Sequence, residues 1–343
     1  MENKISVVVC TYNQENTIAR TLNSVLMQQC HIPFEIIIGE DCSTDGTLGI
    51  CQQYAANHPG IIRLRANKQN RGVADNYFDC LLAASGKYIA DCAGDDFWTD
   101  PLKLEKEIAV MEQHPEVTMV LTRWNWYDEN TRKTTTPPPP PFAESIVKGP
   151  DILEDILTQT DMSVFHLCTS LYRTEVFRAA YEADPHLFRC KDFGTEDIQV
   201  AFTMALGGSF AYLPDFTLNY STGKPSASQQ PDEARQFHFV LSILQVCRYL
   251  TEKHHLSSQR LDNYFSRRFF TLAMHAFRAH RQSLLEELTK YMQAWNVKNH
   301  LPTKLVITVM KHPWLWQVGL AARKVIVSTK RLLTLDHLLE DSL

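Results

Sequence analysis

The chain has 343 residues, of which 44% are hydrophobic and 21% are charged, a composition typical of a globular protein rather than a disordered or fibrous one. Its 34 Lys and Arg residues and 39 Asp and Glu residues give a formal net charge of −5, which argues against general nucleic-acid binding through phosphate neutralisation. The length allows one large domain with an appendage, or two domains.

The nine cysteines are scattered singly rather than as Cys-x-x-Cys pairs, which favours reduced thiols in a cytoplasmic protein over disulfides or a zinc site. Residues 1–12 lack the basic start and apolar core of a signal peptide, and no apolar run reaches the roughly 18 residues of a membrane span. We therefore expect neither secretion by that route nor a transmembrane helix.

Short β-branched runs alternate with helical patterns in the first 92 residues. Strands are predicted at 5–10, 34–38, 61–64 and 87–92, and each is followed by a polar cluster. Strands alternating with helices predict an α/β fold, a mainly parallel sheet with helices on both faces. Because such sheets bind ligands at the carboxyl ends of their strands, the polar clusters mark the expected binding edge.

The pattern changes in the second half of the chain. A helix at 102–113 and a strand from 117 to about 127 are followed by five prolines, 137–141, which must form an extended exposed connector. Whether that segment is a plain linker or a mobile flap stays open. Mixed strand and helix patterns return at 151–206, and beyond about 231 the chain is helical throughout. We expect a catalytic domain at 1–230 and a helical C-terminal region at 231–343.

Six polar clusters, taken in chain order, carry the functional signal. They are Val8 to Asn13, Glu40 to Thr47, Asn70 to Gly72 with Asn76, Ala84 to Ile89, Gly94 to Asp96, and Glu196 with Asp197. In this order they resemble the family 2 glycosyltransferases, which have the Rossmann-like GT-A fold. The resemblance covers about residues 4 to 222, and residues 35–47 are its most specific part.

This resemblance implies an inverting glycosyltransferase of the type that builds bacterial polysaccharides. Such an enzyme moves a sugar, here of the hexosyl or N-acetylhexosaminyl type, from a nucleotide-diphosphate sugar to a hydroxyl of a glycan or lipid-linked glycan. A UDP-sugar is the favoured donor, because Asp41 would accept a hydrogen bond from the ring N–H of a uracil-type base. The other reading of Asp41 is a turn or helix-capping carboxylate.

The remaining donor-binding residues follow from the same resemblance. Arg71 would place a cation near the donor phosphates. The full predicted set is Thr11, Tyr12, Asn13, Glu15, Asp41, Asn70, Arg71 and Asn76.

Asp95 is the expected metal ligand, for Mg²⁺ or Mn²⁺. Hard divalent cations take oxygen ligands and often only one or two protein carboxylates, and here the cation would neutralise charge on the departing nucleoside diphosphate. The sequence departs from the family pattern Asp-x-Asp, because Ala93 stands at its first place. Weaker metal binding and an inactive paralogue therefore stay open. Asp96 would line the site or begin a helix.

Asp197 is the candidate catalytic base. It lies with Glu196 at the start of a predicted helix, where a carboxylate has a defined position, and it would take the proton of the attacking hydroxyl. Glu196 would support it by orientation. The competing reading is a pair of carboxylates that stabilises the helix start.

Between Lys304 and Arg331 there are six Lys or Arg and no acid, interleaved with apolar residues that include Trp314 and Trp316. This pattern suits a helix lying at an anionic membrane surface, so we expect a cytoplasmic protein with peripheral association at the inner leaflet. A packing helix with solvated lysines is the alternative.

Three rival functions differ in their sequence requirements. A nucleotidyltransferase needs a glycine-rich basic loop after the first strand, and residues 11–15 contain neither Gly nor Lys. A dehydrogenase needs a Gly-x-Gly-x-x-Gly motif at that place, which is missing. A glycan- or nucleotide-binding pseudoenzyme of the same fold, motivated by Ala93, remains as the alternative.

Overall fold

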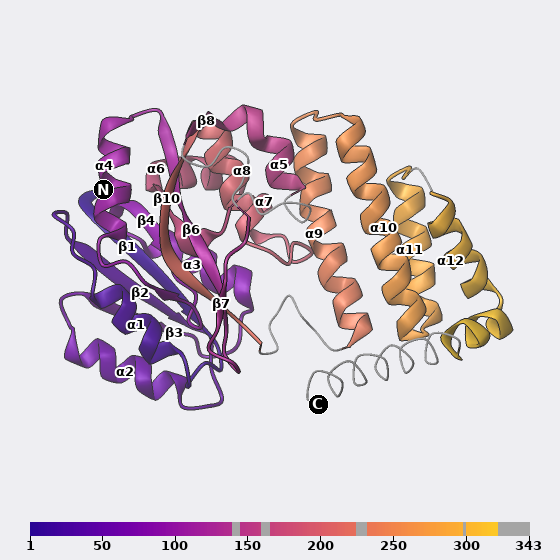
Figure 1. Cartoon of the computed structure of the whole chain (residues 1–343), viewed down its shortest axis with the longest axis horizontal. Helices are drawn as coiled ribbons and strands as arrows, with labels where there is room; N and C mark the ends of the chain where they lie inside the picture. Colours follow the sequence, from indigo (N-terminus) through magenta and orange to yellow (C-terminus); the bar gives the residue numbers. More distant parts are fainter. Residues whose placement is uncertain (139–144, 159–164, 224–231, 298–299, 322–343) are drawn as a thin grey trace, which may run out of the picture. The chain divides into compact units, whose positions relative to one another are not determined.

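The computed structural model describes residues 1–138, 145–158, 165–223, 232–297 and 300–321 (Figure 1). The chain divides into two compact units, one within 1–224 plus 245–250 and the other within 225–244 plus 251–343. The last three of the five prolines, 139–141, lie outside the described residues.

One mixed sheet forms the centre of the first unit. Its strand order is β3-β2-β1-β4-β9-β6-β10-β5, with β7 beside β6 and β8 beside β10. The strands are β1 (Glu2–Thr11), β2 (Phe34–Glu40), β3 (Ile62–Ala66), β4 (Gly86–Asp91), β5 (Phe97–Trp98), β6 (Val117–Asp128), β7 (Thr134–Thr135), β8 (Ile146–Lys148), β9 (Ser170–Arg173) and β10 (Ser209–Thr222).

The predicted α/β class and the Rossmann-like half are confirmed. Strands β3, β2, β1 and β4 are parallel neighbours, as their alternation with helices predicts. Strand β9 then runs antiparallel to both β4 and β6, so the sheet is mixed beyond β4 rather than parallel throughout. Strand β10 pairs with β6 in parallel over most of its length.

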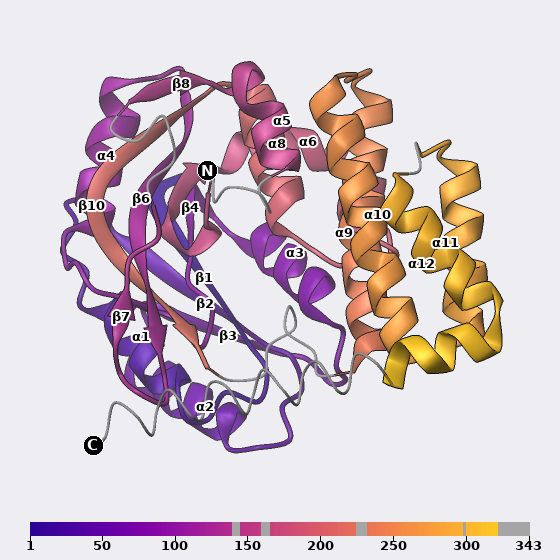
Figure 2. The ribbon, with the colours of Figure 1, turned by 45° about the vertical axis from the view of Figure 1, so that its right-hand side comes forward.

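Helices cover both faces of this sheet (Figures 1 and 2). They are α1 (Ile18–Leu26), α2 (Thr47–Asn57), α3 (Val73–Ala83), α4 (Lys103–Gln113), α5 (Leu153–Leu157), α6 (Thr174–Ala183), α7 (Pro185–Arg189) and α8 (Asp197–Gly207). Short 3₁₀ turns lie at Gly149–Ile152 and Leu167–Thr169.

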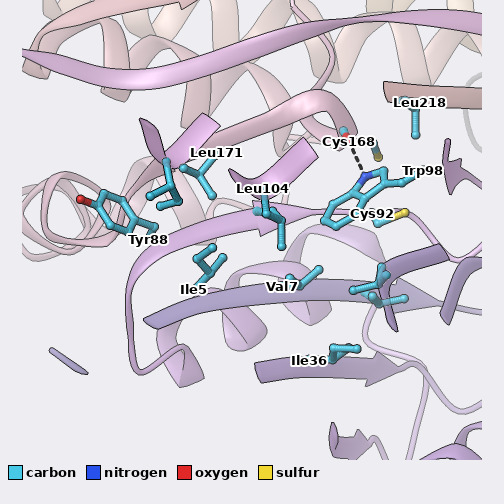
Figure 3. Packing of buried hydrophobic residues seen from close by; sticks show 14 of the residues in the cluster. Ile5, Val7, Ile36, Tyr88, Cys92, Trp98, Leu104, Cys168, Leu171 and Leu218 are labelled. Carbon is cyan, nitrogen blue, oxygen red and sulfur yellow. Dashed lines mark hydrogen bonds between the residues drawn. The ribbon is translucent and has the colours of Figure 1, made fainter. Parts of the chain in front are cut away.

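Alternation along the strands decides which helices each face of the sheet meets. Ile5, Val7 and Val9 of β1 point to one side, because side chains alternate along a strand, and they share a core cluster with side chains of α1, α2 and α4. Within this core Trp98 is fully buried, and its indole N–H donates to the Cys168 carbonyl at 2.9 Å (Figure 3). The sheet that carries the polar loops is therefore supported on one face by a closely packed hydrophobic core.

The second unit is helical, as the C-terminal sequence predicts. It comprises most of α9 (Glu233–Lys253), together with α10 (Gln259–Ala279), α11 (Gln282–Ala294), α12 (Leu301–Lys311) and a further helical stretch at 313–321. The Ser258 hydroxyl caps α10 by accepting from the Leu261 N–H at 3.1 Å, and the Trp316 indole donates to the Phe277 carbonyl at 2.9 Å. In the described part of the chain, every helix falls short of the length and apolarity that a bilayer crossing requires.

Candidate functional site

The ends of three parallel strands bring the first polar loops together. Thr11 closes β1 and is paired in register with Glu40 at the end of β2, and the Asp41 N–H donates to the Thr11 carbonyl at 3.1 Å. On the other side of β1, the Gly94 N–H donates to the Cys10 carbonyl at 3.0 Å. The segments that begin at Thr11, Asp41 and Gly94 therefore share one edge of the sheet.

Gly94 lies unusually close to the end of β1. A Cβ atom at this position would lie 2.4 Å from the Gln14 Oε1 and 2.7 Å from the Thr11 Oγ1, closer than real contacts allow. The Thr11 hydroxyl in turn donates to the Gln14 Oε1 at 2.8 Å. The loop after β4 and the loop after β1 are thus packed directly on each other.

The predicted nucleoside loop is joined to the loop that follows β2. Asn13 has a left-handed φ of 53°, its N–H donates to the Ser43 hydroxyl at 2.9 Å, and its side-chain oxygen accepts from the Thr44 N–H at 2.8 Å. The Glu15 carboxylate accepts from the Gly46 N–H at 2.7 Å. Asn13 and Glu15 therefore shape the loops, whereas Tyr12 is 45% exposed and faces solvent.

Asp41 is buried and already holds a neighbouring loop. Its Oδ1 accepts from the Arg71 N–H at 2.9 Å and from the Asn67 amide at 2.8 Å, and its Oδ2 accepts from the Gly72 N–H at 2.9 Å. The Asn70 amide donates to the Asp41 carbonyl at 3.2 Å. Asp41 thus acts as a turn carboxylate before α3, and its Oδ2, which accepts one hydrogen bond, has lone-pair capacity for a further donor.

Two other predicted donor-binding residues make structural contacts. Asn76 is buried, donates to the Gly39 carbonyl at 2.8 Å and accepts from the Asn67 amide at 2.9 Å. The Arg71 guanidinium pairs with Asp79 at 2.6 Å on the surface of α3. Asn67 was not predicted from the sequence, since a single Asn after a strand carries no distinctive signal.

The aspartates after β4 have different surroundings. Asp95 is half-buried, and burial raises the pKa of its carboxyl, while the Gln14 side chain and the Arg20 guanidinium act in the opposite direction. Asp96 is fully buried; its Oδ1 accepts from the Ser221 N–H at 2.8 Å, and burial raises the pKa of the group well above its usual range. Asp96 therefore belongs to the interior, and Asp95 is the carboxylate nearer the open side.

Asp96 has buried neighbours that the sequence did not connect with it. Its carboxylate, a ring nitrogen of His166 and the Cys168 sulfur lie within 4.8 Å of one another. Burial lowers the pKa of His166 to about 4 and raises that of Cys168 well above its usual range. Burial therefore favours the neutral form of all three groups.

Asp197 lies at the first turn of α8, where the sequence places it. Burial raises the pKa of its carboxyl, and burial together with the Asp197 charge raises the pKa of Glu196 well above the usual range. Glu196 occupies the N-cap position but makes no capping hydrogen bond through its side chain.

Asp91 is a further buried carboxylate that the Asp197 charge influences, and no sequence motif indicates a role for it. It is the last residue of β4 and is 3% exposed, and burial raises its pKa to about 7, with the Asp197 charge acting in the same direction. The Tyr77 and Tyr172 hydroxyls, hydrogen-bonded to each other at 3.0 Å, lower that pKa. The sequence feature that could have indicated Asp91 is a charged residue at the end of a mostly apolar strand.

Tyr220 on β10 connects the two groups of carboxylates. Burial raises the pKa of Tyr220 well above its usual range, and the charges of Asp96, Asp95 and Asp197 all act on it in the same direction.

 The charges of Asp95 and Asp197 therefore both reach the Tyr220 hydroxyl. Of the sequence-predicted residues, Asp41 and Asp95 lie in the loops that follow β2 and β4. Asp197, at the first turn of α8, acts electrostatically on Asp91 at the end of β4.

The donor set at this edge suits a hard divalent cation. Ala93 removes one carboxylate, but the half-buried Asp95 remains, and a cation beside it would offset the cost of burying its charge. Carboxylate oxygens are the ligands that Mg²⁺ and Mn²⁺ prefer, and such ions often use only one or two of them from the protein. The residues present therefore fit a metal of this kind.

The fold is an α/β architecture with polar loops at the carboxyl ends of its parallel strands, and comparison with known sequences identifies its protein family. The profile described as glycosyl transferase family 2 matches residues 6–180, so the chain belongs to this family.

Two curated relatives illustrate the sequence similarity. An uncharacterized protein of Mycobacterium tuberculosis is 44% identical over 115 residues, which cover 34% of this chain and 33% of the relative. The putative glycosyltransferase EpsE of Bacillus subtilis is 41% identical over 126 residues, which cover 37% of this chain and 45% of the relative. The chain thus matches less than half the length of these relatives.

Solved structures show the same fold at low sequence identity. Residues 1–349 of Staphylococcus aureus TarS in complex with UDP-GlcNAc align with a TM-score of 0.54 and 18% identity, covering 91% of each chain. The mannosyltransferase PcManGT of Pyrobaculum calidifontis, in complex with GDP-Man and Mn²⁺, aligns with a TM-score of 0.51 and 16% identity, covering 94% of this chain and 88% of its own. These similarities confirm the GT-A fold.

Proposed function

We propose that this chain is an inverting glycosyltransferase that moves a sugar from a nucleotide-diphosphate sugar to a hydroxyl of a glycan or lipid-linked glycan. The observation that carries the proposal is that the loops of Asp41 and Asp95 meet at the end of β1, while the charges of Asp95 and Asp197 both act on Tyr220. One edge thereby offers a position for a base and ribose, a position for a diphosphate, and a carboxylate with a raised pKa.

Asp41 and Tyr12 are the proposed contacts to the nucleoside. The Asp41 Oδ2 keeps acceptor capacity after holding the Gly72 amide. The exposed Tyr12 follows Thr11, whose carbonyl accepts from the Asp41 N–H, so its ring is offered from the adjoining loop. A UDP-sugar is the favoured donor, which agrees with the UDP-GlcNAc bound to TarS.

Asp95 would hold the divalent cation. When bound, Mg²⁺ or Mn²⁺ would supply positive charge beside the departing nucleoside diphosphate. The protein's own contribution is to keep the Asp95 carboxylate half-buried and close to the loop of Thr11 and Gln14, so that the ligand is held in a defined place.

Asp197 would accept the proton of the attacking hydroxyl. Its raised pKa makes it a stronger base than an ordinary carboxylate. Burial and the Asp197 charge raise the pKa of Glu196 well above its usual range, which favours its protonated form and limits the negative charge beside the base. Attack from the side opposite the leaving diphosphate inverts the anomeric configuration.

The test is a transfer and hydrolysis assay over a panel of nucleotide sugars with Mn²⁺. We expect turnover by the wild type, and a loss of about 100-fold or more in Asp197→Asn. Asp192→Asn is the matched control, because Asp192 is an exposed carboxylate five residues before Asp197 and should leave the rate unchanged. If the wild type and Asp197→Asn are equally inactive while nucleotide sugars still raise the thermal stability, the pseudoenzyme alternative is the better description.

We also propose peripheral association with an anionic membrane through the second unit. Leu301, Leu305, Trp314 and Val318 are 69%, 57%, 66% and 58% exposed, and Lys304 and Lys311 lie exposed among them. The chain contains no Asp or Glu between Glu287 and Asp336. Exposed apolar side chains with cations and no acid suit the headgroup layer of an anionic bilayer. Residues 322–331 of the basic segment lie outside the described residues.

Vesicle flotation tests this surface directly. The full chain should float with vesicles that contain phosphatidylglycerol and remain below with phosphatidylcholine alone, and a variant combining Leu305→Ser and Trp314→Ser should lose the binding. Leu82→Ser with Leu206→Ser is the control, since these are exposed apolar residues of the first unit. Equal flotation of both double variants would exclude this surface as the membrane contact.

A further inference from the structure

Helix α1 holds the Asp95 loop by three consecutive carbonyl oxygens. The Thr17 hydroxyl donates to the Gly94 carbonyl at 2.9 Å, the Arg20 guanidinium donates to the Asp95 carbonyl at 2.9 Å, and the Thr21 hydroxyl donates to the Asp96 carbonyl at 2.6 Å. Positions 17, 20 and 21 lie on one face of the helix, because residues three and four apart are neighbours on a helix surface. The backbone from Gly94 to Asp96 is therefore fixed at every residue.

Arg20 extends this arrangement to the far half of the sheet. Its Nη2 donates to the Glu129 carboxylate at 2.5 Å and to the Ser221 hydroxyl at 3.1 Å, and its Nη1 lies 3.4 Å from the other Glu129 oxygen. Ser221 in turn donates to the Asp95 carbonyl at 2.5 Å through its hydroxyl. One guanidinium thus joins α1, the loop after β4, the segment just after β6, and β10.

Aromatic rings keep the guanidinium in this orientation. The Arg20 guanidinium carbon lies 4.1 Å from the centroid of the Phe97 ring and 5.4 Å from that of Tyr127. A planar fork that donates in several fixed directions is particular to arginine, and a lysine ammonium cannot reproduce it. The planar shape of the Arg20 guanidinium allows its several hydrogen bonds, and its positive charge pairs with Glu129 and the Phe97 ring.

We propose that Arg20 is a positioning residue that orients Asp95 for the divalent cation. Ala93 leaves Asp95 as the carboxylate of the Asp-x-Asp pattern, so the direction of this one side chain decides whether the cation is held. The inference rests on the proposed function, since it concerns the metal that the donor diphosphate needs. Arg20 itself touches neither metal nor substrate and acts only through the loop.

Two measurements on the full chain test this role. Mn²⁺ binding is followed by electron paramagnetic resonance, and the order of the loop is followed by hydrogen exchange of residues 94–98. Arg20→Met should weaken Mn²⁺ binding about 10-fold, within the range seen when outer-sphere partners of metal ligands are lost, and should speed exchange of the loop amides. Arg20→Lys should have intermediate Mn²⁺ affinity and intermediate exchange rates, and it replaces Arg20→Met as the test variant if Arg20→Met does not fold.

Arg123→Met is the matched control, because the Arg123 guanidinium lies 4.3 Å from the centroid of the Phe216 ring and so also loses a cation–π contact when replaced. It should leave Mn²⁺ binding and exchange of residues 94–98 unchanged. Unaltered loop exchange in Arg20→Met would overturn the positioning role, and so would faster exchange with unaltered Mn²⁺ binding. If the wild type binds no Mn²⁺, the metal assignment of Asp95 fails together with this inference, whereas the exchange result still separates that failure from a loss of the loop contacts.

Discussion

Replacing Asp91 by asparagine should stabilise the protein, and more so at high pH. Asp91 is 3% exposed at the end of β4, and burial raises its pKa from 3.8 to about 7. The unfolded chain therefore releases this proton near pH 4, whereas the folded chain retains it until about pH 7. Because the folded state binds more protons across that interval, stability falls as the pH rises through it and then levels off.

The size of the effect follows from the two pKa values. At about 1.36 kcal/mol per pH unit, the raised pKa of Asp91 lowers the free energy of unfolding by roughly 4 kcal/mol above pH 7, and by roughly 2 kcal/mol at pH 5, where only the unfolded chain has ionised. Asparagine has nearly the same shape and carries no charge, so it removes this penalty at both values. The gain in Asp91→Asn should thus be about two to three times as large at pH 8.5 as at pH 5.

Urea unfolding followed by tryptophan fluorescence at these two pH values measures the difference. Asp192→Asn, an exposed carboxylate, is the control and should change little at either pH. If Asp91→Asn raises the free energy of unfolding equally at pH 5 and pH 8.5, or lowers it at pH 8.5, then burial does not raise the pKa of Asp91 as inferred.

Two further predictions concern ionisable groups of the first unit. Since burial raises the pKa of Asp197 and the base must be deprotonated, kcat/KM should decline with falling pH at a value above the range of about 4 typical of exposed carboxylates, which a pH–rate profile measures; a decline only below that range would exclude Asp197 as the base. Lys103 and Glu107 form a fully buried ion pair at 2.7 Å, and burial raises the pKa of Glu107 to about 7. Glu107→Leu, which leaves the Lys103 charge buried without its partner, should lower the free energy of unfolding by about 3–5 kcal/mol, and Lys103→Met added to it should restore most of the loss; an unrestored double variant would indicate that packing, not charge, is responsible.

The repeating part of the fold could be predicted from the sequence. Strands β1 to β4 each combine an apolar run with a following polar cluster, so their order, their parallel direction and the location of Asp41 and Asp95 at one edge follow from local patterns. The antiparallel direction of β9 could not be predicted, because strand direction depends on how the chain returns over a long connection that leaves no periodic signal.

Two features of the site were beyond sequence reasoning for a different reason. The partners of Arg20 lie 75, 109 and 201 positions away in the chain, so no local pattern indicates that this arginine of an ordinary amphipathic helix contacts the Asp95 loop. Asp91 ends a strand that is mostly apolar, and the Asp197 charge that raises its pKa comes from a distant part of the chain. The roles of Arg20 and Asp91 therefore depend on neighbours that are distant in sequence, and residue type alone does not indicate them.

Gly94 has a consequence for how this site can change during evolution. Any side chain at this position would collide with Thr11 and Gln14, so the constraint is steric and independent of catalysis. A lineage could alter the neighbouring Ala93 or exchange donor preference through the loop after β1, but it could not fill position 94 without separating the two loops. Position 94, the central residue of the Asp-x-Asp pattern, is thus restricted to glycine by the close approach of the two loops.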